Sequence, residues 1–192
     1  MMDLIITLAA NIGELSTIKQ KNVMNQKSKI DELFPDGVSV DVNHERVSFS
    51  FKNIDIATLS DEKFNNDVSE LFKIILNSLL IEKFVFLEIF LTDILNKEIS
   101  YESKLNRLKQ IDSHFLGVGN EYRYNDDTFE IRFRYEPNYT VINHGNVYKT
   151  HVLGLKHGTY SLVSLNETLF NAMRKLKTLD DRLLENYIQE NE

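Results

Sequence analysis

Three histidines in the C-terminal half of the chain are the residues best suited to metal chemistry. His151 and His157 share the same parity on a predicted strand, and His144 lies in a nearby predicted turn. Three imidazoles on adjacent strands could bind zinc and leave one coordination position open for water. No carboxylate has ligand spacing beside them, and Gly154 can break the register between the two strand histidines. The competing interpretation is two turn histidines and one histidine on a polar strand face.

Two acidic residues, Asp127 and Glu130, come nearest to the centre of a metal-dependent hydrolase. A nuclease-type centre needs two acids to hold Mg²⁺ and a lysine to orient water, but Arg132 stands at the lysine position. Arginine stays charged, so it cannot deprotonate water. The competing interpretation places Asp127 at the tip of a hairpin, and Glu130 and Arg132 on the solvated face of a strand. The metal-dependent hydrolase is therefore the second alternative.

Other catalytic chemistries find no matching residues in the chain. Cysteine is absent, which removes thiolate metal sites, cysteine nucleophiles and a disulfide framework. There is also no Gly-x-Ser-x-Gly elbow and no complete glycine-rich phosphate loop. Because no constellation supports catalysis, we expect a non-catalytic protein without a cofactor.

The region from Tyr122 to Lys156 concentrates residue types with which sheets bind nucleic acid. Such sheets stack bases on exposed aromatic rings and hold phosphates with basic side chains. Residues 131–160 contain four basic residues and one acidic residue, although the whole chain has a net charge of −7. The candidate residues for binding a ligand or partner are Arg123, Arg132, Arg134, Tyr139, Tyr148, Lys149 and Lys156.

Two features of the chain argue against nucleic acid. Apolar and charged side chains alternate over residues 128–136, which predicts a half-buried strand. The aromatic rings and the arginines of this strand then lie on opposite faces, whereas a stacking platform needs them on one face. The acidic balance of the whole chain also opposes binding to an acidic polymer. Nucleic-acid binding is therefore the first alternative, not the leading function.

Turn signals and periodicity indicate an α+β fold with a mainly antiparallel sheet. Hairpins are predicted near 38–52 and within 121–163, where short turn sequences separate alternating strands. Amphipathic helices are predicted near 61–81, 101–116 and 165–190. We expect Ser60 to cap the first helix, and the acidic pair at 180–181 to lie at the surface or at a cap of the last helix.

Two apolar segments fit either a strand or a helix. Residues 84–92 form a nearly continuous apolar run, and we favour a buried strand over the helix that the same residues allow. Residues 4–15 begin like a strand but also carry leucine and isoleucine at helical spacing. The sequence leaves this second segment open.

Length and composition are those of a globular protein. We expect one compact domain over 1–192, in which about 1–96 and 97–192 could form two similar halves. The apolar run at 76–95 is too charged for a membrane span and the start lacks a basic signal region, so we expect a soluble cytoplasmic protein. The generous apolar content can leave a patch for a partner. The leading function is binding of another protein or self-association, as a subunit or adaptor of a larger complex.

Overall fold

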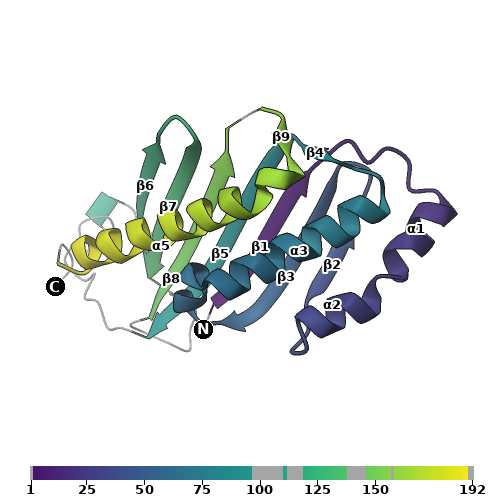
Figure 1. The fold of residues 1–192 in the computed structure, drawn as a ribbon. Helices are drawn as coiled ribbons and strands as arrows, with labels where there is room; N and C mark the ends of the chain where they lie inside the picture. The colour runs from purple at the N-terminus through teal and green to yellow at the C-terminus, as the bar shows by residue number, and fades with distance from the viewer. Residues whose placement is uncertain (1, 97–109, 112–118, 138–145, 157, 190–192) are drawn as a thin grey trace.

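The fold is built on a sheet of seven strands. The computed structural model describes residues 2–96, 110–111, 119–137, 146–156 and 158–189. The strands lie in the order β2-β3-β1-β5-β8-β7-β6, and each neighbouring pair is antiparallel (Figure 1). They are β1 (Met2–Ala9), β2 (Ser39–Val42), β3 (Arg46–Ile54), β5 (Phe86–Asn96), β6 (Asn120–Asn125), β7 (Phe129–Pro137) and β8 (Asn146–Leu155). The predicted α+β fold with a mainly antiparallel sheet is confirmed.

Two long helices cover one face of this sheet (Figure 1). α3 (Glu62–Ser78) lies over the part that contains β3, and α5 (Leu165–Gln189) lies over the part that contains β7. The smaller elements are α1 (Thr17–Met24), α2 (Lys27–Leu33), the 3-10 turns η1 (Ile56–Ser60) and η2 (Leu162–Ser164), and a two-stranded pairing of β4 (Lys83–Phe84) with β9 (Tyr160–Ser161). Within the described ranges, no helix has the length and apolar character needed to cross a membrane.

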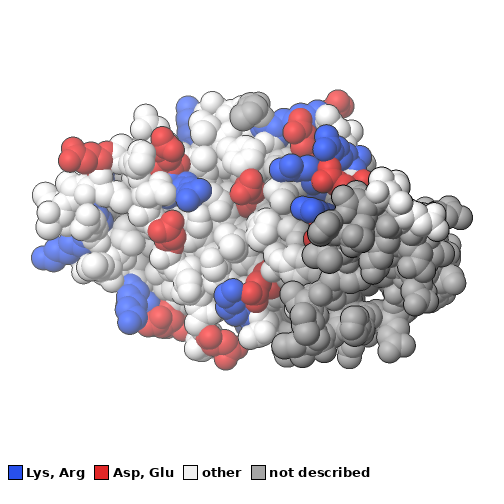
Figure 2. All heavy atoms as spheres, turned by 180° about the vertical axis from the view of Figure 1, so that it is seen from behind, with Lys and Arg blue, Asp and Glu red and all other residues white. Residues whose placement is uncertain are grey.

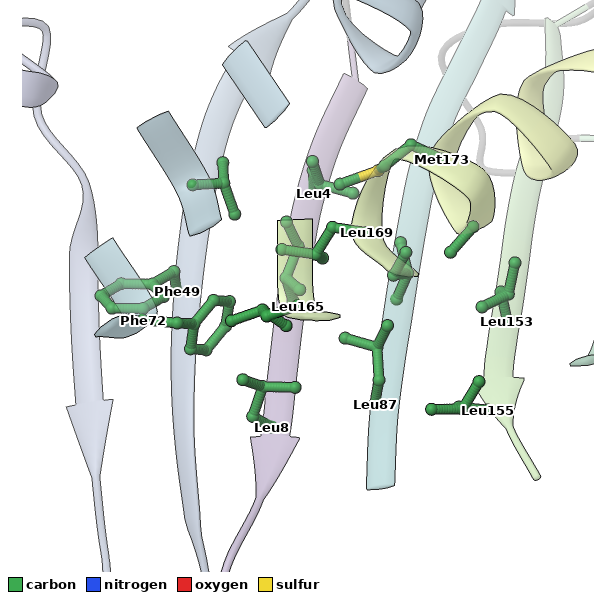
Figure 3. Close-up of a cluster of buried hydrophobic side chains, with 14 of the residues drawn as sticks. Leu4, Leu8, Phe49, Phe72, Leu87, Leu153, Leu155, Leu165, Leu169 and Met173 are labelled. Carbon is green, nitrogen blue, oxygen red and sulfur yellow. The ribbon is translucent and has the colours of Figure 1, made fainter. Parts of the chain in front are cut away.

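The core fills the space between the two long helices and the sheet. Every second side chain of β1, from Met2 to Leu8, is buried, as the two-residue period of a strand requires. The ring of Phe49 on β3 packs edge-on against Phe72 on α3, with the ring centroids 4.5 Å apart. Figure 3 shows the side chains that α5 adds to the same layer: Leu165, Leu169 and Met173.

In both segments that fitted either a strand or a helix, the structure has a strand and no helix. Residues 86–96 form β5 at the centre of the sheet, as favoured, and residues 2–9 form β1 beside it. Leu87 and Leu91 on β5 are buried beneath the helices, whereas Phe86 and Phe90 lie on the opposite face and are only partly buried. A central strand has apolar neighbours on both faces, so its residues form a continuous apolar run instead of alternating with polar ones.

The start of α3 differs by one residue from the sequence prediction. Ser60 ends η1, and Asp61 is the N-cap residue of α3. The Asp61 carboxylate accepts hydrogen bonds from the backbone N–H groups of Lys63 at 2.8 Å and Phe64 at 3.4 Å. An acidic cap also faces the positive end of the helix dipole, which favours Asp61 over the preceding serine. The prediction of Ser60 as the cap is wrong.

Both predicted hairpins are present in the described residues. β2 pairs with β3 across residues 43–45, and β6 pairs with β7 across residues 126–128. In the second turn, Asp126 Oδ1 accepts hydrogen bonds from the backbone N–H groups of Thr128 and Phe129 at 2.8 and 2.7 Å. The helix predicted at 101–116 lies outside the described residues, except that 110–111 are helical.

Candidate interaction surface

The face of the sheet turned away from α3 and α5 is termed the open face. It carries the side chains that alternate with the buried ones along the seven strands. Neither of the two long helices lies over this face (Figure 1). Figure 2 shows mostly uncharged side chains across the described middle of this face, and Lys and Arg gathered together with Asp and Glu towards the β6–β7 end. The open face is therefore a broad surface with distinct apolar and charged parts.

One row of open-face residues crosses the entire sheet. From one edge strand to the other, the register aligns Ser39, Ser50, Ile5, Phe90, Val152, Arg132 and Arg123. The three apolar members of this row lie on β1, β5 and β8 and are partly exposed. Directly opposed residues on neighbouring strands lie about 5 Å apart, so their side chains touch. Ile5, Phe90 and Val152 together form a continuous surface, termed the apolar strip.

The arginine end of the row lies among acidic side chains. Arg123 is directly opposite Arg132, and Glu121 is directly opposite Arg134. Arg123 Nε lies 2.7 Å from Glu121 Oε1, and Arg134 forms an ion pair with Glu136. The hydrogen bond from Arg123 lowers the pKa of Glu121 below its ordinary value, with a smaller contribution from the nearby positive charges. Glu121 therefore remains ionised, and its ion pair partly neutralises Arg123.

A shallow depression of about 580 Å³ opens beside this end of the row. Gly154 forms part of its floor, where a Cβ atom would lie 3.3 Å from the ring of Phe86. The missing side chain lets the Phe86 ring lie against strand β8. The charged residues that line the depression are Glu88, Arg123, Glu130, Arg132 and Lys156. Because both signs are present, the depression is not a strongly selective anion site.

Among the residues that the structure describes, the charges of the open face are balanced. Its acidic side chains are the six residues Asp3, Asp41, Glu88, Glu121, Glu130 and Glu136. Its basic side chains are the six residues Arg46, Lys52, Arg123, Arg132, Arg134 and, directly after β8, Lys156. The whole chain has a net charge of −7, so the excess of acidic residues lies outside this set.

The structure brings together part of the predicted set of binding residues. The open face contains Arg123, Arg132, Arg134, Tyr148 and Lys156. Lys149 and His151 lie on the covered face and are 2% and 0% exposed. Tyr148 and Lys149 are consecutive on β8, and a strand turns consecutive side chains to opposite faces. Tyr139, His144 and His157 lie outside the described residues.

Lys149 and His151 belong to a buried cluster beneath α5. Its centre is Asp180, whose carboxylate accepts hydrogen bonds from Tyr135 Oη at 2.7 Å, His151 Nε2 at 2.8 Å and Lys149 Nζ at 2.9 Å. Asp93 on β5 lies directly opposite Lys149, with 3.6 Å between Oδ2 and Nζ. These five residues are termed the buried cluster. It connects α5 to β5, β7 and β8.

Burial and charge set the protonation of two groups in the buried cluster. Burial by itself would raise the pKa of Asp180, but the hydrogen bond from His151 and the positive charge of Lys149 hold that pKa well below its ordinary value. Burial and the Asp180 carboxylate together raise the pKa of Tyr135 far above its ordinary value. Asp180 is therefore ionised and Tyr135 neutral at neutral pH.

The geometry of the buried cluster suits a structural role. The side chains of Lys149, His151 and Asp180 are 0–3% exposed, so a substrate cannot reach them. His151 Nδ1 has no hydrogen-bond partner among the described residues. No three His, Cys, Asp or Glu side chains in the described ranges are arranged to hold a metal ion. We interpret the buried cluster as the anchor of α5 on the sheet.

Asp180 is the residue of this cluster that the sequence prediction misplaced. Asp181 is exposed, as expected, and pairs with Lys177 at 2.6 Å, but Asp180 is only 2% exposed. A signal for its burial does exist in the sequence. Asp180 follows Leu176 by four residues and so continues the buried stripe of α5. An acid within an apolar stripe requires a buried partner, because an unpaired buried charge is very costly.

Comparison of the chain with protein-family models, with curated proteins and with solved structures finds no match in any of the three. The function therefore has to be inferred from the geometry and charge of the described residues.

Proposed function

We propose that this chain is a non-catalytic binding or assembly protein that contacts another protein through the open face. The observation that carries the proposal is the apolar strip of Ile5, Phe90 and Val152. An antiparallel sheet can leave one face in water, but the side chains of that face are then usually polar. A run of partly exposed apolar side chains in the middle of a face that neither long helix covers is instead typical of a protein-binding surface.

The surroundings of the apolar strip support the same proposal. Protein interfaces combine an apolar centre with a polar rim. Thr7 and Thr92 flank the strip on β1 and β5, and the charged residues of β6 and β7 lie to one side of it. Ile94, which is 51% exposed, extends the apolar surface along β5.

Nucleic-acid binding is a second candidate, favoured by the directly opposed pair Arg123 and Arg132. Like charges in that arrangement are destabilising, and an anion between them would relieve the repulsion. The acidic residues that alternate with these arginines oppose a polyanion. Phe129 and Phe133, on the strand of Arg132, are buried beneath the helices and cannot stack on bases. A protein partner is therefore the better-supported proposal, and no described arrangement favours the metal-dependent hydrolase.

Capture of partners from cell extract tests the proposal. The bait is the full chain, compared with Phe90→Lys, whose long side chain keeps its apolar stem but brings a charge to the strip. The matched control is Thr178→Lys, which makes the same change of charge on an exposed position of α5. We expect Phe90→Lys to lose partners that the control retains. Identical recovery by both variants would contradict binding through the open face.

Two parallel measurements address the remaining predictions. Fluorescence anisotropy with oligonucleotides tests the second candidate, which predicts affinity that falls steeply with salt and with Arg132→Glu. Cell fractionation tests the cytoplasmic location expected from the sequence.

A further inference from the structure

We propose that one end of the molecule docks on an anionic lipid surface. This end consists of residues 13–30, 79–85 and 160–164, all of them described, and is termed the docking end. Figure 1 shows α1, the end of α3 and the β4–β9 pair on the side of the molecule away from the C-terminal end of α5. The apolar strip lies on β1, β5 and β8, so this inference goes beyond the proposed function.

Leu80, in the turn that follows α3, is a strained residue with an exposed side chain. Its φ of 59° lies in the left-handed region, where a Cβ atom costs free energy and glycine would not. Residues held in such conformations cluster at functional sites, where the strain is kept because the side chain is needed. The strained and exposed Leu80 is therefore suited to contact a surface outside the chain.

Val163 protrudes from the neighbouring segment of the chain. β4 pairs with β9, and the contact continues where the N–H of Leu162 donates to the carbonyl of Glu82 at 3.0 Å. Leu80 and Val163 are 90% and 89% exposed, more than any other large apolar side chain of the described residues. Both protrude from turns, and a protruding apolar side chain can enter a lipid surface without the complementary pocket that a protein interface requires.

The exposed side of α1 adds apolar side chains with a charge between them. α1 lies against the end of α3, where Asn22 Nδ2 donates to the carbonyl of Ser78 at 3.3 Å. Ile18, Lys21 and Met24 follow one another at intervals of three residues, so they form one row on the helix surface, and all three are exposed. A lysine in such a row can keep its stem in lipid while its charge reaches the head groups.

The charge of the docking end complements an anionic surface. Its three segments contain five lysines and two acids, Glu14 and Glu82, although the whole chain has a net charge of −7. Among the described residues, no carboxylate forms an ion pair with the exposed Lys21, Lys27 or Lys29.

This local positive charge outweighs the acidic remainder of the chain at a surface. The Debye length at physiological salt is about 8 Å, so a surface attracts the nearest charges and is little affected by the distant acids. Asp31 and Glu32 lie in the last turn of α2, beyond the lysines. An acidic protein could also bind lysines, but protruding apolar side chains beside unpaired lysines match a lipid surface better.

Co-sedimentation of the purified full chain with lipid vesicles tests the docking end. We expect the wild type to bind phosphatidylcholine vesicles that contain phosphatidylserine, and not vesicles of phosphatidylcholine alone. Lys21→Glu should weaken this binding roughly 20-fold, because it replaces an attraction by a repulsion. The matched control is Lys63→Glu, which makes the same change of charge on an exposed residue at the other end of α3, about 25 Å away.

Two results of this experiment would overturn the proposal. One is a wild-type chain that does not bind the phosphatidylserine vesicles; a protein partner that Lys21→Glu then fails to capture would assign the docking end to an acidic protein instead. The other is an equal loss of binding by Lys21→Glu and Lys63→Glu. Neither result concerns the open face, which partner capture with Phe90→Lys tests separately.

Substitution of Leu80 tests the apolar contact without weakening the fold. Leu80→Gly removes the side chain and relieves the backbone strain, so a loss of vesicle binding by this variant does not come from unfolding. We expect Leu80→Gly to bind phosphatidylserine vesicles roughly fivefold more weakly than the wild type, because it loses a leucine that would be partly buried in lipid. Leu80→Met keeps an apolar side chain and should retain the binding. Wild-type binding by Leu80→Gly would overturn the role of Leu80 in docking.

Discussion

Single residues of the buried cluster connect α5 to the sheet through charge. Asp180 bonds to side chains of β7 and β8, and Lys149 also lies near Asp93 of β5. Buried ion pairs add little net stability, because desolvation offsets the attraction, but removal of one partner leaves the others uncompensated. We infer that the buried cluster determines where the C-terminal half of α5 lies more than it stabilises the fold.

Replacement of Asp180 should be the most damaging single change in this cluster. We expect Asp180→Ala to lower the free energy of unfolding by about 3–5 kcal/mol, because it leaves a buried lysine and histidine without their shared carboxylate. The neighbouring Asp181→Ala removes only an exposed ion pair with Lys177. It should change the free energy of unfolding by less than about 0.5 kcal/mol. Urea denaturation at neutral pH measures both variants. Losses of equal size would contradict the anchoring role.

Tyr135 should make the fold sensitive to alkaline pH. The pKa of Tyr135 is raised in the folded state. The stability that neutral Tyr135 contributes is therefore complete below the pKa of an unfolded tyrosine, about 10, and is lost as pH rises above that value. Tyr135→Phe removes both the ionisable group and the 2.7 Å hydrogen bond to Asp180, at a cost of about 1.5–3 kcal/mol near pH 8. The gap between wild type and variant should then narrow by about 1.4 kcal/mol per pH unit above pH 10. A gap that stays constant to pH 11 in urea titrations would exclude this linkage.

Among the structural elements, α3 is followed by a leucine at a position where glycine is usual. Leu80 has a φ of 59°, and the N–H of Ile81 donates to the carbonyl of Leu76 at 2.8 Å. This is the hydrogen-bond pattern of a Schellman motif, whose left-handed residue is most often glycine. The Leu80 side chain is 90% exposed, so packing within the chain does not offset the backbone strain.

Leu80→Gly should therefore stabilise the protein. A left-handed residue with a Cβ costs about 1–2 kcal/mol, and the additional entropy of glycine in the unfolded chain costs about 0.5–1 kcal/mol. We expect the free energy of unfolding to rise by about 0.5–1 kcal/mol. Leu80→Ala is the matched control, because it removes the same exposed side chain but keeps the Cβ. Equal free energies of unfolding for Leu80→Ala and Leu80→Gly, measured by heat or urea, would show that the backbone strain at this position is absent.

For the whole molecule, the charge distribution should make binding through the open face depend little on salt. The described charges of this face cancel, so screening removes little attraction from a protein partner there. We expect a captured protein partner to be retained as ionic strength rises from low to physiological values. Partner capture at the two salt concentrations measures this. Loss of binding with salt would contradict a neutral interface and is the behaviour expected of binding to nucleic acid.

The sequence by itself determined the elements whose patterns are local. Residues 129–135 alternate between buried apolar and exposed charged side chains as predicted, because the geometry of a strand turns successive residues to opposite faces whatever its neighbours are. The hairpin near 38–52 and the helices α3 and α5 were predictable because their periodicity is likewise a local property of the chain. The division of the chain into similar halves stays a prediction.

Only the tertiary structure decided which strands are neighbours. The apolar strip joins residues 5, 90 and 152 because β5 lies between β1 and β8, and periodicity along one segment does not encode that order. The same contacts settled that residues 2–9 form a strand, and turned Lys149 and His151 beneath α5 to meet Asp180. Side-chain alternation is a property of each strand, whereas the open face and the buried cluster are properties of the assembled sheet.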